Sequence, residues 1–128
     1  MGKVKVYLSF DVAHDVDAKT MLVEQTNQAD SPFEIVDAST KDRMTVACKQ
    51  NIHRRMENVD MVLVLCGVHT RRASGVNAEV AIAQEMGKPY FHLAAYPKAC
   101  KRPKAAKASD KIYLWTWNNI KNLICGGR

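Results

Sequence analysis

The stretch Met61-Val-Leu-Val-Leu-Cys66 decides the fold of this 128-residue chain, because every one of its residues is apolar. A strand that is apolar on both faces is typical of the centre of a parallel sheet, where helices cover both sides. Other short segments, rich in β-branched and aromatic residues, predict four further strands. These segments are residues 3–9, 33–36, 90–94 and 111–115.

Segments with a helical repeat of apolar residues lie between the predicted strands. They are residues 15–26, 48–59 and 74–86, and a last helix begins near Trp117. This alternation predicts a parallel sheet with right-handed crossovers and helices on both faces. We therefore expect one domain, residues 1–128, with a flavodoxin-like α/β fold in three layers and a five-stranded sheet in the order 2-1-3-4-5.

The composition agrees with a single cytoplasmic domain. Apolar residues make up 47% of the chain and charged residues 25%, the balance of an ordinary globular protein. The longest apolar run is far shorter than the roughly 20 residues that a membrane span needs, and the N-terminus leads into a strand rather than a signal sequence. The cysteines and histidines have no metal-binding or disulfide-framework spacing, so we expect free thiols and no metal site.

The net charge of +6 is concentrated in residues 98–107, KACKRPKAAK, which contain no acidic residue. A basic surface attracts nucleic acid, but it also attracts any small molecule that carries phosphate. No aromatic residue is interleaved to stack on bases. We therefore expect a solvated loop and no nucleic-acid partner.

The topology predicts where a ligand would bind. In a doubly wound sheet the ligand crevice lies beyond the carboxyl ends of the strands, at the switch point between the first and third strands. Three segments meet there: the loop Ser9-Phe10-Asp11, the loop Gly67-Val-His69-Thr70, and the start of the third helix. His69 is the only histidine that this placement brings beside the crevice.

Three common ligand classes of this fold have no support in the sequence. The loop after the first strand lacks the hydroxyl- and glycine-rich run that would bind FMN. Leu65, Cys66 and Gly67 stand where a response-regulator receiver needs a phosphate-accepting aspartate. No G-x-G-x-x-G follows a strand, so a dinucleotide bound in the Rossmann manner is also unsupported.

Glu79 has an unusual position in the third helix. At 100° per residue, the apolar residues of this helix fall within about 60° of Glu79, so the carboxylate is centred on the apolar face. A carboxylate placed there is costly unless something pairs with it, which makes it a candidate functional group. The alternative is that Glu79 is an acidic residue favoured near the helix start by the helix dipole. The pattern alone leaves both interpretations open.

Five segments carry a resemblance to a known family. They are VYLSFD (6–11), SPFEIVD (31–37), VDMVLVLCGVHT (59–70), GVNAEVAIAQEMGKP (75–89) and WTWNNIK (115–121). In this order they resemble the bacterial TIR-like family, which includes the TIR-like subunit of Thoeris antiphage systems. The resemblance spans nearly the whole chain.

The resemblance implies an activity and a set of site residues. Thoeris TIR-like proteins cleave the nicotinamide–ribose bond of NAD and release an ADP-ribose-derived messenger that activates an effector protein. NAD is then a substrate rather than a cofactor, and catalysis often depends on a homo-oligomer. The family's catalytic glutamate falls on Glu79, and its pocket loop falls on Ser9, Phe10 and Asp11. Gly67, His69 and Gly75 complete the expected substrate-binding set.

One departure from the family and two alternatives affect this prediction. Typical TIR domains carry a tryptophan ahead of the glutamate, where this chain has Gly75 and Ala78. Nucleoside deoxyribosyltransferases, in which the glutamate is a covalent nucleophile, share Gly75, Glu79, Ala83 and residues 87–89. They usually place an aspartate and a threonine at the positions of Ala73 and Val76. The third hypothesis is a non-catalytic TIR-like interaction module.

Overall fold

The fold contains one parallel five-stranded sheet. It is described here from a computed structural model, in which residues 3–40 and 45–126 are placed. The strands are β1 (Val4–Ser9), β2 (Phe33–Ala38), β3 (Met61–Cys66), β4 (Tyr90–Ala94) and β5 (Ile112–Tyr113). Their order is β2-β1-β3-β4-β5, and all neighbouring pairs are parallel. This confirms the predicted flavodoxin-like α/β fold and its strand order.

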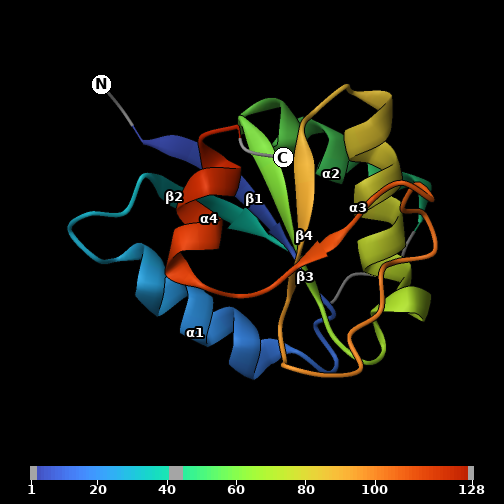
Figure 1. The fold of residues 1–128 in the computed structure, drawn as a ribbon. Helices are drawn as coiled ribbons and strands as arrows, with labels where there is room; N and C mark the ends of the chain where they lie inside the picture. The colour runs from blue at the N-terminus through green and yellow to red at the C-terminus, as the bar shows by residue number, and fades with distance from the viewer. Residues whose placement is uncertain (1–2, 41–44, 127–128) are drawn as a thin grey trace.

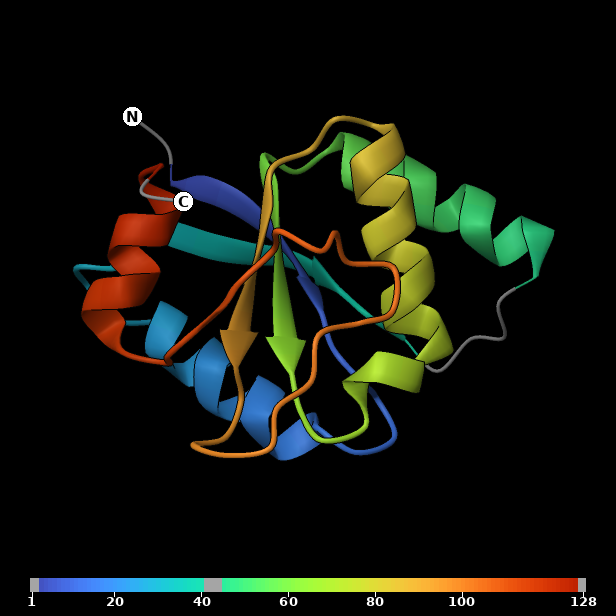
Figure 2. The same ribbon diagram turned by 45° about the vertical axis from the view of Figure 1, so that its right-hand side comes forward.

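Helices cover both faces of the sheet (Figures 1 and 2). They are α1 (Val16–Thr26), α2 (Val46–Glu57), α3 (Ser74–Glu85) and α4 (Trp117–Ile124), with a short 3-10 helix η1 (Thr70–Arg72) before α3. The apolar residues of α1 and α4 pack in one core cluster, and those of α2 and α3 pack in a second cluster on the opposite face. The sheet is therefore the middle of three layers.

Strand β1 divides its side chains between these two clusters. Val6 and Leu8 face the cluster beneath α1 and α4, whereas Tyr7 faces the cluster beneath α2 and α3. This follows from the alternation of side chains along a strand. Ser9, two residues after Tyr7, is on the same face, so two hydroxyl groups of β1 point toward α3.

The last strand is shorter than the sequence predicted. Residues 111–115 were expected to form it, but β5 contains only Ile112 and Tyr113. It pairs only with His92 and Leu93 at the sheet edge. After Tyr113 the chain turns away from the sheet, with Leu114 exposed and the indole of Trp115 donating a hydrogen bond to the Gln25 side chain of α1 at 2.7 Å.

Two further findings come from the described part of the chain. Within residues 3–40 and 45–126, no helix has the length and apolar character to cross a bilayer. The four cysteines, all inside this part, are free thiols, as expected from their spacing.

Candidate active site

Glu79 lies in the second turn of α3 and is only 2% exposed. Its carboxylate accepts hydrogen bonds from three hydroxyl groups. Ser9 Oγ donates to Oε1 at 2.8 Å, and Ser39 Oγ donates to the same oxygen at 2.5 Å. The Tyr7 hydroxyl donates to Oε2. Two of these donors come from β1 and the third directly follows β2, so three distant parts of the chain build the site.

The buried position controls the ionisation of this group. Burial raises the pKa of Glu79 above its ordinary value, although the hydroxyls of Ser39, Tyr7 and Ser9 favour the ionised form and act against the shift. Burial, followed by the charge of the Glu79 carboxylate, also raises the pKa of Tyr7. Tyr7 therefore remains a protonated donor. The site holds a carboxylate that is hydrogen-bonded but takes up a proton more readily than a surface glutamate.

The ion pair between Arg55 and Asp37 lies against the ring of Tyr7. The guanidinium of Arg55 donates two hydrogen bonds to Asp37, from Nε at 2.8 Å and from Nη2 at 2.5 Å, and a third to the Ala38 carbonyl. It also lies 5.4 Å from the centre of the Tyr7 ring, within the range of a cation–π contact. The Arg55 hydrogen bonds lower the pKa of Asp37. Asp37 is thus part of a structural ion pair.

A small cavity of about 290 Å³ lies at Ser39, one of the three donors to Glu79, and Glu79 itself is not among its lining residues. Its lining includes Phe10, Asp11, Ser39, Ser74 and Gly75. Ser39 connects the cavity to the glutamate, because the same hydroxyl that donates to Glu79 accepts a hydrogen bond from the Phe10 backbone N–H at 3.0 Å. A ligand in this cavity would meet Ser39 before it reached Glu79.

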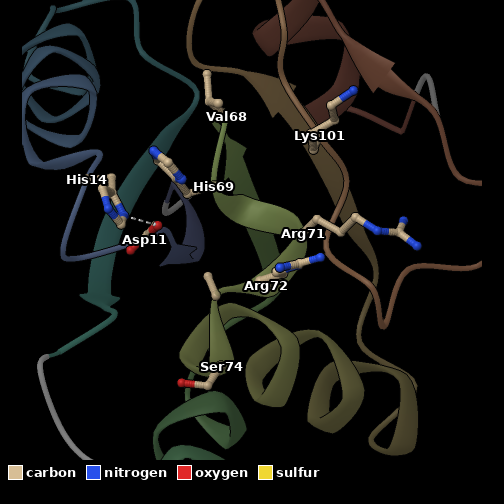
Figure 3. A pocket seen from close by; sticks show the side chains of 9 residues that line it. Asp11, His14, Val68, His69, Arg71, Arg72, Ser74 and Lys101 are labelled. Atoms are coloured by element: carbon tan, nitrogen blue, oxygen red, sulfur yellow. Dashed lines mark hydrogen bonds and ion pairs between the residues drawn. The ribbon is translucent and has the colours of Figure 1, made fainter.

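A larger cavity of about 600 Å³, which we call the basic cavity, adjoins the small one (Figure 3). The two share Asp11, Ala73 and Ser74 as lining residues. The basic cavity is also lined by His14, His69, Arg71, Arg72 and Lys101. The Asp11 carboxylate bonds to His14 Nδ1 at 2.7 Å and accepts from the Ala13 backbone N–H. The rings of His14 and His69 are stacked, with centroids 4.0 Å apart.

The structure brings together six of the seven residues predicted from sequence. Ser9 contacts Glu79, and Phe10, Asp11 and Gly75 line the small cavity. His69 lines the basic cavity. Ligand contact by each of these residues stays a prediction.

Gly67 has a different environment from the other six. It is buried and is not among the lining residues of either cavity. Its N–H donates to Thr70 Oγ1 at 2.7 Å, and a Cβ atom at this position would lie 2.5 Å from Asp15 Oδ2. The observed role of Gly67 is to allow the buried Asp15 carboxylate to approach the backbone.

Sequence reasoning missed several residues of the site. Tyr7 had a usable signal, because it precedes Ser9 by two positions and so lies on the same face of the strand. Ser39 and Arg55 had none, since their partners lie far away in the sequence. The residues of the basic cavity also come from separate segments of the chain, as Figure 3 shows. Among the residues that the structure describes, no group of histidine, cysteine and acidic side chains is arranged to hold a metal ion.

The parallel sheet in this order, with Glu79 buried near the switch point, agrees with the TIR-like family that the sequence resembles. Residues 7–99 match the family model of the Thoeris protein ThsB, TIR-like domain. Because this match covers most of the chain, the chain belongs to that family, which has a role in the Thoeris antiphage system. No curated protein matches the chain.

Proposed function

We propose that this protein cleaves the nicotinamide–ribose bond of NAD in the cytoplasm and releases an ADP-ribose-derived signalling nucleotide that activates an effector protein. The observation that carries the proposal is the Glu79 carboxylate, which is buried on α3 and bonded to three hydroxyls, one of which, that of Ser39, belongs to a residue lining a cavity. Family membership supports the same chemistry.

A single carboxylate suits this reaction. When the bond breaks, its electron pair moves to the nicotinamide nitrogen, which becomes neutral, and positive charge develops on the ribose. A negative group facing that charge binds the transition state more tightly than the substrate. Nicotinamide leaves without protonation, so the second carboxylate of an ordinary glycosidase is unnecessary. Water or a nitrogen of the adenine then captures the ribosyl group.

Ser39 gives the substrate a way to reach Glu79. The ribose of NAD carries hydroxyl groups, which can donate to Oε1 in place of the Ser39 hydroxyl. Tyr7 and Ser9, which are deeper in the sheet, keep the carboxylate in position during this exchange. Since only the ionised carboxylate stabilises positive charge and burial raises its pKa, the activity should rise with pH through a pKa above that of an ordinary glutamate.

Mass spectrometry of nucleotides after incubation with NAD tests the proposal, with and without lysate from phage-infected cells, since the active form can require a trigger or an oligomer. We expect nicotinamide release with the native protein and loss of at least a hundredfold in Glu79→Gln. The matched control is Glu85→Gln, an exposed carboxylate of the same helix, which should keep full activity.

The same experiment separates the alternatives. Equal nicotinamide release from native protein and Glu79→Gln would contradict catalysis by this residue. No turnover of NAD by either protein, with or without the lysate, would favour a non-catalytic interaction module. Incubation with a deoxynucleoside and a free base tests the deoxyribosyltransferase hypothesis. Base exchange at an unchanged NAD level would overturn the NAD proposal.

A further inference from the structure

The basic cavity contains more positive charge than its own carboxylate can balance. We propose that it binds the diphosphate group of the dinucleotide substrate, with Arg71, Arg72 and Lys101 as the phosphate-binding side chains. This inference rests on the proposed function for the identity of the ligand, while the anion-binding character of the cavity is argued from its own residues.

Cationic side chains outnumber carboxylates in the lining of the basic cavity. Three permanent cations and two histidines line the cavity, against one carboxylate, Asp11. Asp11 is already bonded to His14 and to a backbone N–H. Within residues 3–40 and 45–126, neither Arg71, Arg72 nor Lys101 pairs with a carboxylate. The cavity therefore has free cationic groups for an anionic ligand.

Two other arginines, Arg55 and Arg102, have structural roles in this protein. Arg55 is bound to Asp37. Arg102, next to Lys101, donates to three backbone carbonyls, those of Lys107, Ala108 and Asp110, and so holds its own loop together. Within the part of the chain that the structure describes, the side chains of Arg71, Arg72 and Lys101 make no structural hydrogen bond of this kind, and they line a cavity.

The elements that carry these cations are fixed to one another. The Lys101 backbone N–H donates to the Gly67 carbonyl at 3.0 Å, and the Lys104 N–H donates to the Arg71 carbonyl at 3.2 Å. Asn77 of α3 bonds to the same Arg71 carbonyl and accepts from the Ala105 N–H at 2.7 Å. The loop after β4, the helix η1 and the start of α3 therefore form one frame, so the backbone that carries the cations need not be ordered on binding.

The position of the cavity fits a diphosphate. In NAD the two phosphates follow the nicotinamide ribose, so a ribose beside Ser39 in the small cavity places them about one sugar away. The wall shared by the two cavities, at Asp11, Ala73 and Ser74, is where the ligand would pass from one to the other. Arginine suits this role because its guanidinium forms paired hydrogen bonds to phosphate oxygens.

Calorimetric titration with ADP-ribose, inorganic pyrophosphate and nicotinamide riboside tests the proposal. The variant is Arg71→Ala/Arg72→Ala. The control is Lys98→Ala/Lys107→Ala, which replaces two exposed lysines of the loop after β4 that do not line the cavity. We expect the arginine variant to bind ADP-ribose about tenfold or more weakly, the loss of at least one charge-assisted hydrogen bond. Its affinity for nicotinamide riboside, which lacks phosphate, should be unchanged.

Three other results would overturn the inference, and a fourth would separate it from the proposed reaction. ADP-ribose binding within twofold of native in the arginine variant overturns the inference, and so does native protein that binds neither ADP-ribose nor pyrophosphate. Tighter binding of a single-stranded oligonucleotide than of ADP-ribose through the same arginines also overturns it. Arginine-dependent ADP-ribose binding without NAD consumption, even when lysate from phage-infected cells is added, would support the phosphate site and reject the proposed reaction, so the two failures are distinguishable.

Discussion

Replacing Tyr7 with phenylalanine tests the hydrogen-bonded carboxylate directly. The change removes one hydroxyl and keeps the ring that packs between α3 and the Arg55 guanidinium. Oε1 of Glu79 has two donors, Ser9 and Ser39, whereas Tyr7 is the only donor to Oε2 among the described residues. Tyr7→Phe therefore leaves a buried carboxylate oxygen without a partner.

The expected cost follows from the charge on the acceptor. A hydrogen bond to an ionised group contributes about 1.5–3 kcal/mol, and the lower end applies if Glu79 takes up a proton instead. Loss of the donor raises the pKa of Glu79 further, because that hydroxyl favours the ionised form. The destabilisation should be largest above the pKa of Glu79 in the folded variant. It should shrink as the pH falls and the carboxyl becomes protonated in both folded proteins.

Urea unfolding of four proteins measures this effect: the native chain, Tyr7→Phe, Glu79→Gln and the double variant. Because the two side chains are in contact, the double-mutant cycle should give a coupling free energy of about 1–3 kcal/mol at neutral pH. Tyr96→Phe, which removes a hydroxyl that donates to Asp15 and not to Glu79, is the control and should show no coupling to Glu79→Gln.

The reasoning is refuted if the coupling is absent while both single variants remain folded. It is also refuted if Tyr7→Phe lowers the free energy of unfolding by as much at low pH as at neutral pH, since the hydroxyl would then not be bonded to an ionisable group.

Two further predictions concern stability. Gly67→Ala should lower the free energy of unfolding by about 1–3 kcal/mol, because its Cβ would lie within 3 Å of the buried Asp15 carboxylate, whereas Gly75→Ala, with open space around it, should be neutral or stabilising in the same urea assay. Burial lowers the pKa of His92, so the unfolded chain takes up the proton first and stability should fall as the pH drops below about 6.5. Urea midpoints at two pH values should show a smaller fall in His92→Gln than in native protein, and an unchanged fall in the exposed control His53→Gln.

The sequence predicted most of the sheet because burial on two faces leaves a clear pattern. Residues 61–66 form β3 with every side chain buried, and the strand order is the one expected for this alternation of strands and helices. The edge strand was harder to predict. Residues 111–115 have the composition of a strand, but Trp115 is used for packing against α1, and this depends on a contact across 90 positions.

The candidate site was predictable only in part, for a similar reason. The helical phase of α3 placed Glu79 on the buried face, where the structure also has it. Helical phase contains no information about which side chains donate hydrogen bonds to Glu79. Ser39 meets Glu79 only after β2 and α3 are both in place. The basic cavity is still less visible in sequence, because Lys101 reaches it through a loop whose path is set by backbone hydrogen bonds.

The origin of the three hydroxyl donors also bears on the order of folding. Glu79 and its partners are separated by 72, 70 and 40 positions. If α3 docked on the sheet before β1 and β2 were complete, a charged group would be buried without donors, at a cost of several kcal/mol. We therefore expect α3 to dock late and together with the N-terminal strands, so that compact intermediates with a half-built site are rare.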